Sequence, residues 1–148
     1  MRICENKEEL SYSVNSNISD FQAAMGINQL KRLNHFIEIR ESIADIYNRK
    51  LLQTHHGVPR NYEERKNVYY QYPIRITRSL KDAVKFLKRN NVEVQPLISK
   101  PLHQFLGLPA EDFPNTEKAF LKALAVPIYP ALLNSEVEHI AKVIAHVK

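Results

Sequence analysis

The stretch that decides the fold is residues 15–33, NSNISDFQAAMGINQLKRL. Ser19 stands three residues before Gln22, which is the spacing of a capping box, in which each side chain accepts a hydrogen bond from the other residue's backbone N–H. The sequence therefore predicts a helix that begins near Asp20. Gly26 falls inside this helix, where glycine costs roughly 1 kcal/mol relative to alanine. Its presence calls for a structural reason.

The predicted helix continues well beyond this stretch. Apolar residues recur close to the helical period at Phe21, Ala24, Ile27, Leu30, Leu33, Ile37, Ile43, Ile46 and Leu51. The pattern runs for about 30 residues, or roughly 45–50 Å at a rise of 1.5 Å per residue. A domain of this size cannot cover such a length with its own core. We therefore expect the helix to pack against a second domain or another subunit.

The segment after the helix predicts a loop and then a strand. Residues 51–67 contain Gly57, Pro59 and many polar side chains, which is typical of a loop. The alternation in VYYQYPIRI (68–76) predicts a strand that places Tyr70, Tyr72, Ile74 and Ile76 on one face. Pro73 then requires an edge position or an outward-facing nitrogen, because proline has no N–H to donate.

The remaining residues predict short elements that alternate in type. Ser79 can cap a helix that extends to about residue 90, and VEVQ (92–95) predicts a short strand. Residues 96–114 are expected to be irregular, and residues 116–124 are expected to form a helix. AVPIYP (125–130) is expected to be extended, and Ser135 with Glu138 predicts the start of a last helix. We therefore expect an α+β fold in which a long N-terminal helix accompanies a small, mainly antiparallel sheet packed by helices. The predicted parts are a long interface helix at 19–52 and a small α+β domain at 53–148.

Composition is that of one soluble globular domain. The chain has 148 residues, of which 44% are hydrophobic and 25% are charged. Its single cysteine, Cys4, excludes an internal disulfide and fits a reducing compartment. No segment has the apolar run of a signal peptide or of a membrane span. We expect a cytoplasmic protein without a membrane partner.

The net charge of +5 is unevenly distributed. A basic cluster consists of Arg75, Arg78, Lys81, Lys85, Lys88 and Arg89. This cluster is either the solvated face of a helix or a phosphate-binding surface. No RNA- or DNA-reading motif accompanies it, which favours the solvated face.

Few residues have the spacing of a catalytic or metal site. The lone cysteine excludes a zinc pattern, and the six histidines are not spaced as metal ligands. The sequence has neither a G-x-S-x-G elbow nor a glycine-rich phosphate loop. His103 lies in the proline-stiffened KPLHQF (100–105), a better place for ligand contact than a helix face. A surface loop histidine is the alternative interpretation.

These stretches together resemble the C-terminal part of the DegT-type sugar aminotransferases, which use pyridoxal phosphate to aminate nucleotide-linked keto-sugars. The resemblance is carried by residues 17–33, 69–76, 92–105 and 113–144, in the family's order and with its approximate spacing. RICENKEEL (2–10) also looks like the family's strand just after the cofactor lysine, which implies a strand and turn remnant at 1–18. In the family the long helix packs closely in the dimer, which implies that Gly26 permits an approach of backbone that a side chain would block.

The resemblance also implies two site residues. The turn before the helix reaches the partner subunit's cofactor, so Asn15 is expected at the cofactor phosphate. His103 matches a histidine on the substrate side, so its ring should be accessible at a concave surface. The chain departs from the family pattern at Asn17, where a basic residue is usual, at Tyr70, where histidine is common, and at Gln95, where some members have arginine.

The family's large domain carries the Schiff-base lysine and the aspartate that pairs the pyridine nitrogen, and neither is expected among these residues. The resemblance thus implies the C-terminal domain, or a truncated form, of a nucleotide-sugar aminotransferase of polysaccharide biosynthesis. We expect it to be inactive and free of cofactor alone, and to form a homo-oligomer or to assemble with a complementary large domain. The alternatives are a non-catalytic protein-interaction module and a basic nucleic-acid-binding domain.

Overall fold

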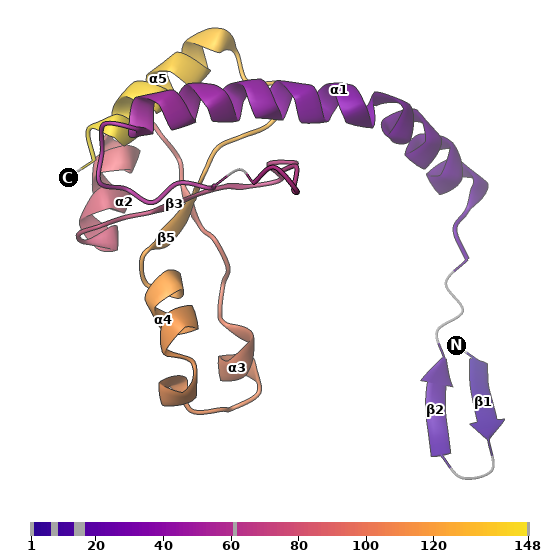
Figure 1. Ribbon diagram of the computed structural model, residues 1–148. Helices are drawn as coiled ribbons and strands as arrows, with labels where there is room; N and C mark the ends of the chain where they lie inside the picture. Colours follow the sequence, from indigo (N-terminus) through magenta and orange to yellow (C-terminus); the bar gives the residue numbers. More distant parts are fainter. Residues whose placement is uncertain (1, 7–8, 14–16, 61, 148) are drawn as a thin grey trace. The chain divides into compact units, whose positions relative to one another are not determined.

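The computed structural model of the chain describes residues 2–6, 9–13, 17–60 and 62–147. They belong to two compact units, Met1–Asn34 and His35–Lys148, and the boundary falls inside the longest helix (Figure 1). Within the described ranges, no helix combines the length and apolar character needed to cross a bilayer.

The first unit contains a hairpin and the start of the long helix. Strands β1 (Arg2–Asn6) and β2 (Glu9–Ser13) pair antiparallel. Helix α1 (Asp20–Leu51) follows. The backbone N–H of Gln22 donates to Ser19 Oγ at 3.3 Å, and the N–H of Ser19 donates to Gln22 Oε1 at 3.0 Å. These two bonds confirm the predicted capping box. It was predictable from the sequence because it depends only on residues a few positions apart along the chain.

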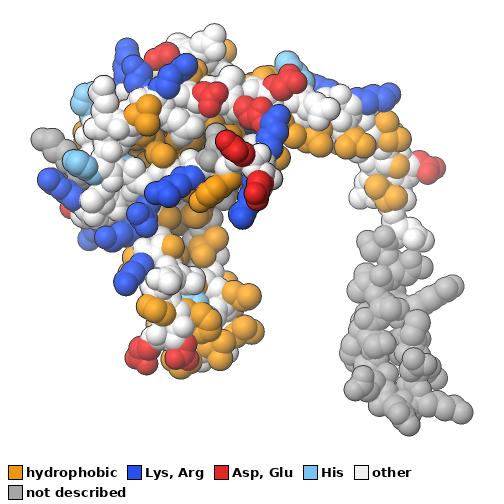
Figure 2. Space-filling model, viewed as in Figure 1, with side chains coloured by type: hydrophobic (Ala, Val, Ile, Leu, Met, Phe, Trp, Pro, Cys, Tyr) orange, Lys and Arg blue, Asp and Glu red, His pale blue; other side chains and the backbone are white. Residues whose placement is uncertain are grey.

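The N-terminal part of α1 and the residues just before it expose large apolar side chains. Six of them are at least 45% exposed: Ile18, Phe21, Met25, Ile27, Leu30 and Leu33. Figure 2 shows hydrophobic side chains along this part of the helix. A Cβ added at Gly26 would meet no described atom within 4 Å, so contacts inside the described chain do not account for this glycine.

The second unit is built around a three-stranded antiparallel sheet. Its strands β3 (Tyr72–Arg75), β4 (Gln95–Pro96) and β5 (Ala123–Val126) stand in the order β3-β5-β4. Helices α2 (Leu80–Arg89) and α5 (Asn134–Ala145) and the C-terminal part of α1 contribute to one hydrophobic core with this sheet. Members of that core include Ile43, Tyr47, Leu51, Tyr72, Ile74, Leu87, Leu124 and Ile144. The predicted α+β class, with its long helix and small antiparallel sheet, is confirmed.

Two buried tyrosines tie α1 to the sheet. The hydroxyl of Tyr47 donates to the carbonyl oxygen of Pro127 at 2.9 Å, and that of Tyr72 donates to Asn48 Oδ1 at 2.7 Å. The two rings meet edge to face at 5.1 Å between centroids. Burial raises the pKa of both hydroxyls, which holds them in the protonated form that donates these bonds.

Strand β3 is shorter than predicted, and Tyr70 is not on its buried face. Tyr72, Ile74 and Ile76 are fully buried, whereas Tyr70 is 79% exposed. The cause is Tyr69, whose φ of 46° lies in the left-handed region and interrupts the alternation. Pro73 does occupy an edge strand, as predicted.

The outer edge of β3 is covered by the loop that follows α1. The N–H of Gly57 donates to the carbonyl oxygen of Arg75 at 3.0 Å, and the N–H of Arg75 donates back to Gly57 at 2.8 Å. A Cβ at Gly57 would lie 3.2 Å from Arg75 Cβ, so a side chain there would crowd the strand. Glycine is therefore the residue that lets the loop approach closely.

Helix α2 begins as predicted and ends in a Schellman motif. The N–H of Asp82 donates to Ser79 Oγ at 3.3 Å, which confirms the cap. At the other end the N–H of Val92 donates to the carbonyl of Leu87 at 2.9 Å, and that of Asn91 donates to Lys88 at 3.1 Å. Asn91 has a φ of 57°, a conformation that asparagine adopts more readily than most residues.

The start of α5 differs from the prediction. The backbone N–H of Leu133 donates to Glu136 Oε2 at 2.8 Å, and Leu133 has the extended backbone of a capping residue. The predicted pair of Ser135 and Glu138 is therefore wrong by two positions. The observed bond is donated by the backbone N–H of Leu133 and involves no serine hydroxyl. The spacing of Ser135 and Glu138 in the sequence therefore predicted the wrong residues.

Between β4 and β5 the chain forms an arm of short helical pieces, residues 97–122. They are α3 (Leu102–Phe105), a 3-10 turn η1 (Ala110–Asp112) and α4 (Pro114–Phe120). Part of this segment was expected to be irregular, and the predicted helix at 116–124 begins earlier, at Pro114. Proline is well suited to the first turn of a helix, which explains the earlier start.

Candidate functional site

A groove of about 590 Å³ lies in the second unit, along β5 and the start of α5. We call it the β5 groove. It is lined by Tyr70, Gln71, Asn91, Val92, Glu93, Gln95, Ala125, Val126, Pro127, Ile128, Tyr129, Leu132, Ser135, Glu136, His139 and Ile140. Its volume is in the range of small-molecule sites, and it combines apolar walls with a few polar groups, as such sites do.

Polar contacts hold several of these residues in place. Arg40 Nη1 donates to the carbonyls of Tyr69 and Tyr70, at 3.0 and 3.1 Å, and thereby supports the left-handed turn that precedes the groove. His139 Nε2 lies 2.8 Å from the carbonyl oxygen of Asn90, an acceptor, so this nitrogen carries the proton. The Schellman motif at the end of α2 fixes the backbone conformation of Asn91.

The charge of the groove is acidic. Its ionisable lining residues include the carboxylates of Glu93 and Glu136. None of the described residues that line it is a lysine or an arginine. A ligand that donates hydrogen bonds or carries positive charge therefore suits the groove better than an anion.

His103 lies in the arm and not in the β5 groove. The residue is 5% exposed, its ring stacks on Phe113 at 4.5 Å between centroids, and its Nε2 lies 2.7 Å from Glu117 Oε1. The expectation that this ring is accessible at a concave surface is wrong. The helical turn α3 directs the ring towards α4, outside the main hydrophobic core.

Two side chains of the arm, those of His103 and Gln104, contact the carboxylate of Glu117. Gln104 Nε2 donates to Glu117 Oε1 at 2.6 Å, beside the contact from His103. The hydrogen bond from Gln104, and then that from His103, lowers the pKa of the Glu117 carboxyl. Sequence reasoning missed this group, because Glu117 is distant from His103 along the chain.

The other predicted site residues fall in different places. Tyr70 and Gln95, two positions that depart from the family pattern, both line the β5 groove. Asn17 is exposed, and Asn15 lies outside the described residues. Among the residues that the structure describes, no three histidine, cysteine or carboxylate groups are placed to hold a metal ion. The groove residue His139 was not identified from the sequence as a ligand-contacting residue.

Comparison with known proteins gives the family. The sequence profile of the DegT/DnrJ/EryC1/StrS aminotransferase family matches residues 3–145. The chain belongs to this family. The resemblance seen in the sequence motifs is thereby confirmed, and from here on we refer to it as the DegT family.

Individual relatives are longer than this chain. The spore coat polysaccharide biosynthesis protein SpsC of Bacillus subtilis is 28% identical over 142 residues, which cover 86% of this chain and 36% of SpsC. The UDP-4-amino-4,6-dideoxy-N-acetyl-beta-L-altrosamine transaminase of Campylobacter jejuni (strain 81-176) is 29% identical over 117 residues, 78% of this chain and 28% of that protein. The chain thus spans about a third of the length of these two DegT-family proteins.

A solved structure supports the fold assignment. DesV of S. venezuelae superposes with a TM-score of 0.84 over 96% of this chain and 40% of DesV, at 19% sequence identity. At this identity the likeness concerns the fold. It covers the long helix as well as the small sheet.

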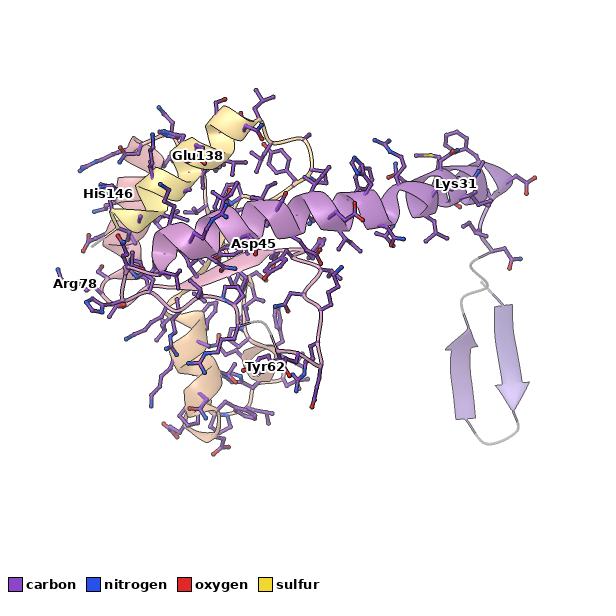
Figure 3. The ribbon with its side chains drawn as sticks, turned by 45° about the horizontal axis from the view of Figure 1, so that its top comes forward. Lys31, Asp45, Tyr62, Arg78, Glu138 and His146 are labelled. Atoms are coloured by element: carbon purple, nitrogen blue, oxygen red, sulfur yellow. The ribbon has the colours of Figure 1, made fainter. Side chains whose placement is uncertain are left out.

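The DegT family uses pyridoxal phosphate, and the described residues do not by themselves fit its Schiff-base site. Such a lysine is poised by burial or by a neighbouring charge. Every described lysine of this chain is exposed, including Lys31 on α1 (Figure 3), and none lines the β5 groove. A covalent site for the cofactor would need a lysine from elsewhere.

Proposed function

We propose that this chain forms the small α+β domain and the dimer-contact helix of a nucleotide-sugar aminotransferase of the DegT family. The observation that carries the proposal is the family match over residues 3–145. Amino transfer requires pyridoxal phosphate as an electron sink, held on a lysine. We infer that this lysine and the acidic partner of the cofactor ring belong to a large domain, and that the chain alone does not transaminate.

The names of two relatives support a proposal for the substrate class. The Campylobacter protein is named for a UDP-linked amino sugar, and SpsC for polysaccharide biosynthesis. We propose that the complete enzyme aminates a nucleotide-linked keto-sugar used to build a polysaccharide. We also propose a cytoplasmic location, since the single cysteine fits a reducing compartment.

The exposed helix supports self-association. Leu30 and Leu33 are 69% and 45% exposed, and a Cβ at Gly26 would meet no described atom. A second copy packed on this face would bury these side chains and use the space beside Gly26. The turn before α1, with Asn15, would then reach the cofactor of the partner subunit.

A reconstitution assay tests this function. The chain is mixed with a separately expressed large domain from a relative such as SpsC, pyridoxal phosphate, an amino donor and a UDP-linked keto-sugar. We expect transamination from the mixture and none from this chain alone. Saturable formation of one imine on a single lysine of this chain, with turnover, would overturn the proposal.

The exposed apolar helix also favours a second candidate, a non-catalytic protein-interaction module. This module would bind a partner through the same face without restoring activity. Failure of several large domains to give activity, together with tight binding to any of them, would favour this candidate.

A further inference from the structure

We propose that His103 is a positioning residue, which holds α3 against α4 so that the apolar side chains of α3 form a docking surface for a large domain of the DegT family. We call this surface, made of Leu102, Phe105 and Leu106, the α3 ridge. The proposal rests on the proposed function for the identity of the partner. The orientation of α3 and the role of His103 follow from the arm itself.

The short helix α3 has a polar side chain inside and apolar side chains outside. His103 is 5% exposed, whereas Leu102 and Phe105 are 72% and 64% exposed, and Leu106, at the C-cap, is 66% exposed. Positions 102, 105 and 106 have the spacing of residues on one helix face. Figure 2 shows hydrophobic side chains gathered at the end of the arm. A surface helix normally has the opposite arrangement, so this outward apolar face calls for a partner that covers it.

The contacts of His103 account for the inverted orientation. Its Nε2 lies 2.7 Å from Glu117 Oε1, and its ring stacks on Phe113 with an angle of 14° between the ring planes. A carboxylate oxygen is an acceptor, so His103 Nε2 carries the proton of this bond. Gln104 donates to the same oxygen at 2.6 Å. Two consecutive side chains of α3 are thus bonded to α4, which leaves the other face of α3 turned outward (Figure 1).

The main hydrophobic core gives the α3 ridge no cover. None of the described members of that core lies within residues 97–122. The apolar side chains of the ridge therefore do not serve the core of the second unit. Burial of these side chains requires a surface from outside that core.

A large domain is the partner that fits the ridge. The matched region covers 36% of SpsC, so most of that protein lies outside it and can supply a covering surface. Lys100 Nζ lies 5.2 Å from the centre of the Phe105 ring, which places a positive charge at the edge of the ridge. The complementary surface is therefore apolar with an acidic group at its rim.

The test is a calorimetric titration of the 148-residue chain with the separately expressed large domain of SpsC, after absorbance has shown that this domain holds pyridoxal phosphate. Leu102→Ala and Phe105→Ala should each weaken binding about tenfold, because each removes apolar surface that the partner buries. Leu52→Ala is the control. Leu52 is 78% exposed and lies outside the arm, so this change should leave binding unaltered.

Variants of His103 separate positioning from contact with substrate. His103→Leu removes the hydrogen bond and the stacked ring, and it should weaken binding about tenfold, as the ridge variants do. His103→Gln keeps a side-chain donor for Glu117 and should restore most of the binding. At saturating large domain, both variants should show the KM of the parent chain for a UDP-linked keto-sugar. Because His103 lies outside the main core, both should keep the thermal transition of the parent chain.

Three results would overturn the proposal: unaltered binding of the large domain by the ridge variants, a raised KM in His103→Gln with unaltered binding, or self-association of the chain that Leu102→Ala abolishes. Ridge-dependent binding without amino transfer would count against the proposed function only. Amino transfer with binding that is insensitive to the ridge would count against the ridge only. Absence of binding by the parent chain would count against both.

Discussion

At the scale of single residues, the outcome for His103 shows what a sequence can predict about a side chain. The proline-stiffened segment around His103 predicted an accessible ring, whereas the ring is buried. That depends on Phe113 and Glu117, which contact His103 only after the arm has folded. Tyr69 is a similar case, because its conformation depends on Arg40 from α1.

The Glu117 contacts predict an acid-sensitive arm. Because the folded-state pKa of Glu117 is lowered from 4.5, the stabilisation from this carboxylate is present above pH 4.5 and is lost as the pH falls through the lowered value. We expect the ring-proton NMR shifts of Phe113 to move towards unstacked values in this range. Glu117→Gln should reduce the pH dependence, while Glu111→Gln, at an exposed position in the same arm, should retain it. An unchanged pH profile in Glu117→Gln would contradict the prediction.

The two buried tyrosines predict a loss of stability in alkali. Their hydroxyl pKa values are raised above 10, so stability is complete below pH 10 and declines as the pH rises above it, where the unfolded chain ionises first. Urea unfolding between pH 8 and 11 should give a smaller decline for Tyr72→Phe, at a cost of about 1 kcal/mol at neutral pH. Tyr62→Phe, with an exposed ring, serves as the control. An equal alkaline decline in Tyr72→Phe would refute the assignment.

At the scale of elements, the sequence was most informative where the determinants are local. The capping box at Ser19, the N-cap at Ser79 and the helical period of α1 depend on residues a few positions apart, and both helices begin where predicted. The β5 groove could not be predicted in this way. It brings together the end of α2, strand β5 and the start of α5, which meet only through tertiary packing.

Gly26 gives a prediction that separates the helix itself from its contacts. Gly26→Ala should stabilise an isolated α1 by about 1 kcal/mol, because alanine is the better helix former. The same change should weaken self-association if a second backbone lies against this face. Sedimentation velocity and helical circular dichroism measure the two effects on one sample. Gln29→Ala, exposed on the same helix, is the control, and equal association of both variants would show that no close approach occurs.

At the scale of the whole molecule, the second unit contains its own core. His35–Lys148 includes every member of the main hydrophobic cluster, whereas the described helix of the first unit exposes most of its apolar side chains. The fold class was predictable from the order of the elements. The division into two units was not predictable, because the boundary between them falls within one unbroken helical pattern.

This division predicts that residues 35–148 fold without the rest of the chain. We expect the fragment to keep a cooperative thermal transition and to sediment as a monomer at concentrations where the 148-residue chain associates. The physical reason is that deletion of 1–34 removes the exposed apolar residues of α1 and none of the core. A fragment that is unfolded, or that associates as strongly as the 148-residue chain, would contradict this.

The close pairing of Gly57 with Arg75 has a further consequence for growth of the sheet. An open strand edge is a template on which foreign strands can add, and this is how many β proteins aggregate. Here the loop residue occupies the backbone groups of Arg75 on one edge, and Pro96 on the opposite edge has no N–H to offer. Both features make it harder for a further strand to add to the sheet. Replacement of Gly57 by a bulky residue should expose the β3 edge, and we expect this variant to form fibrils more readily.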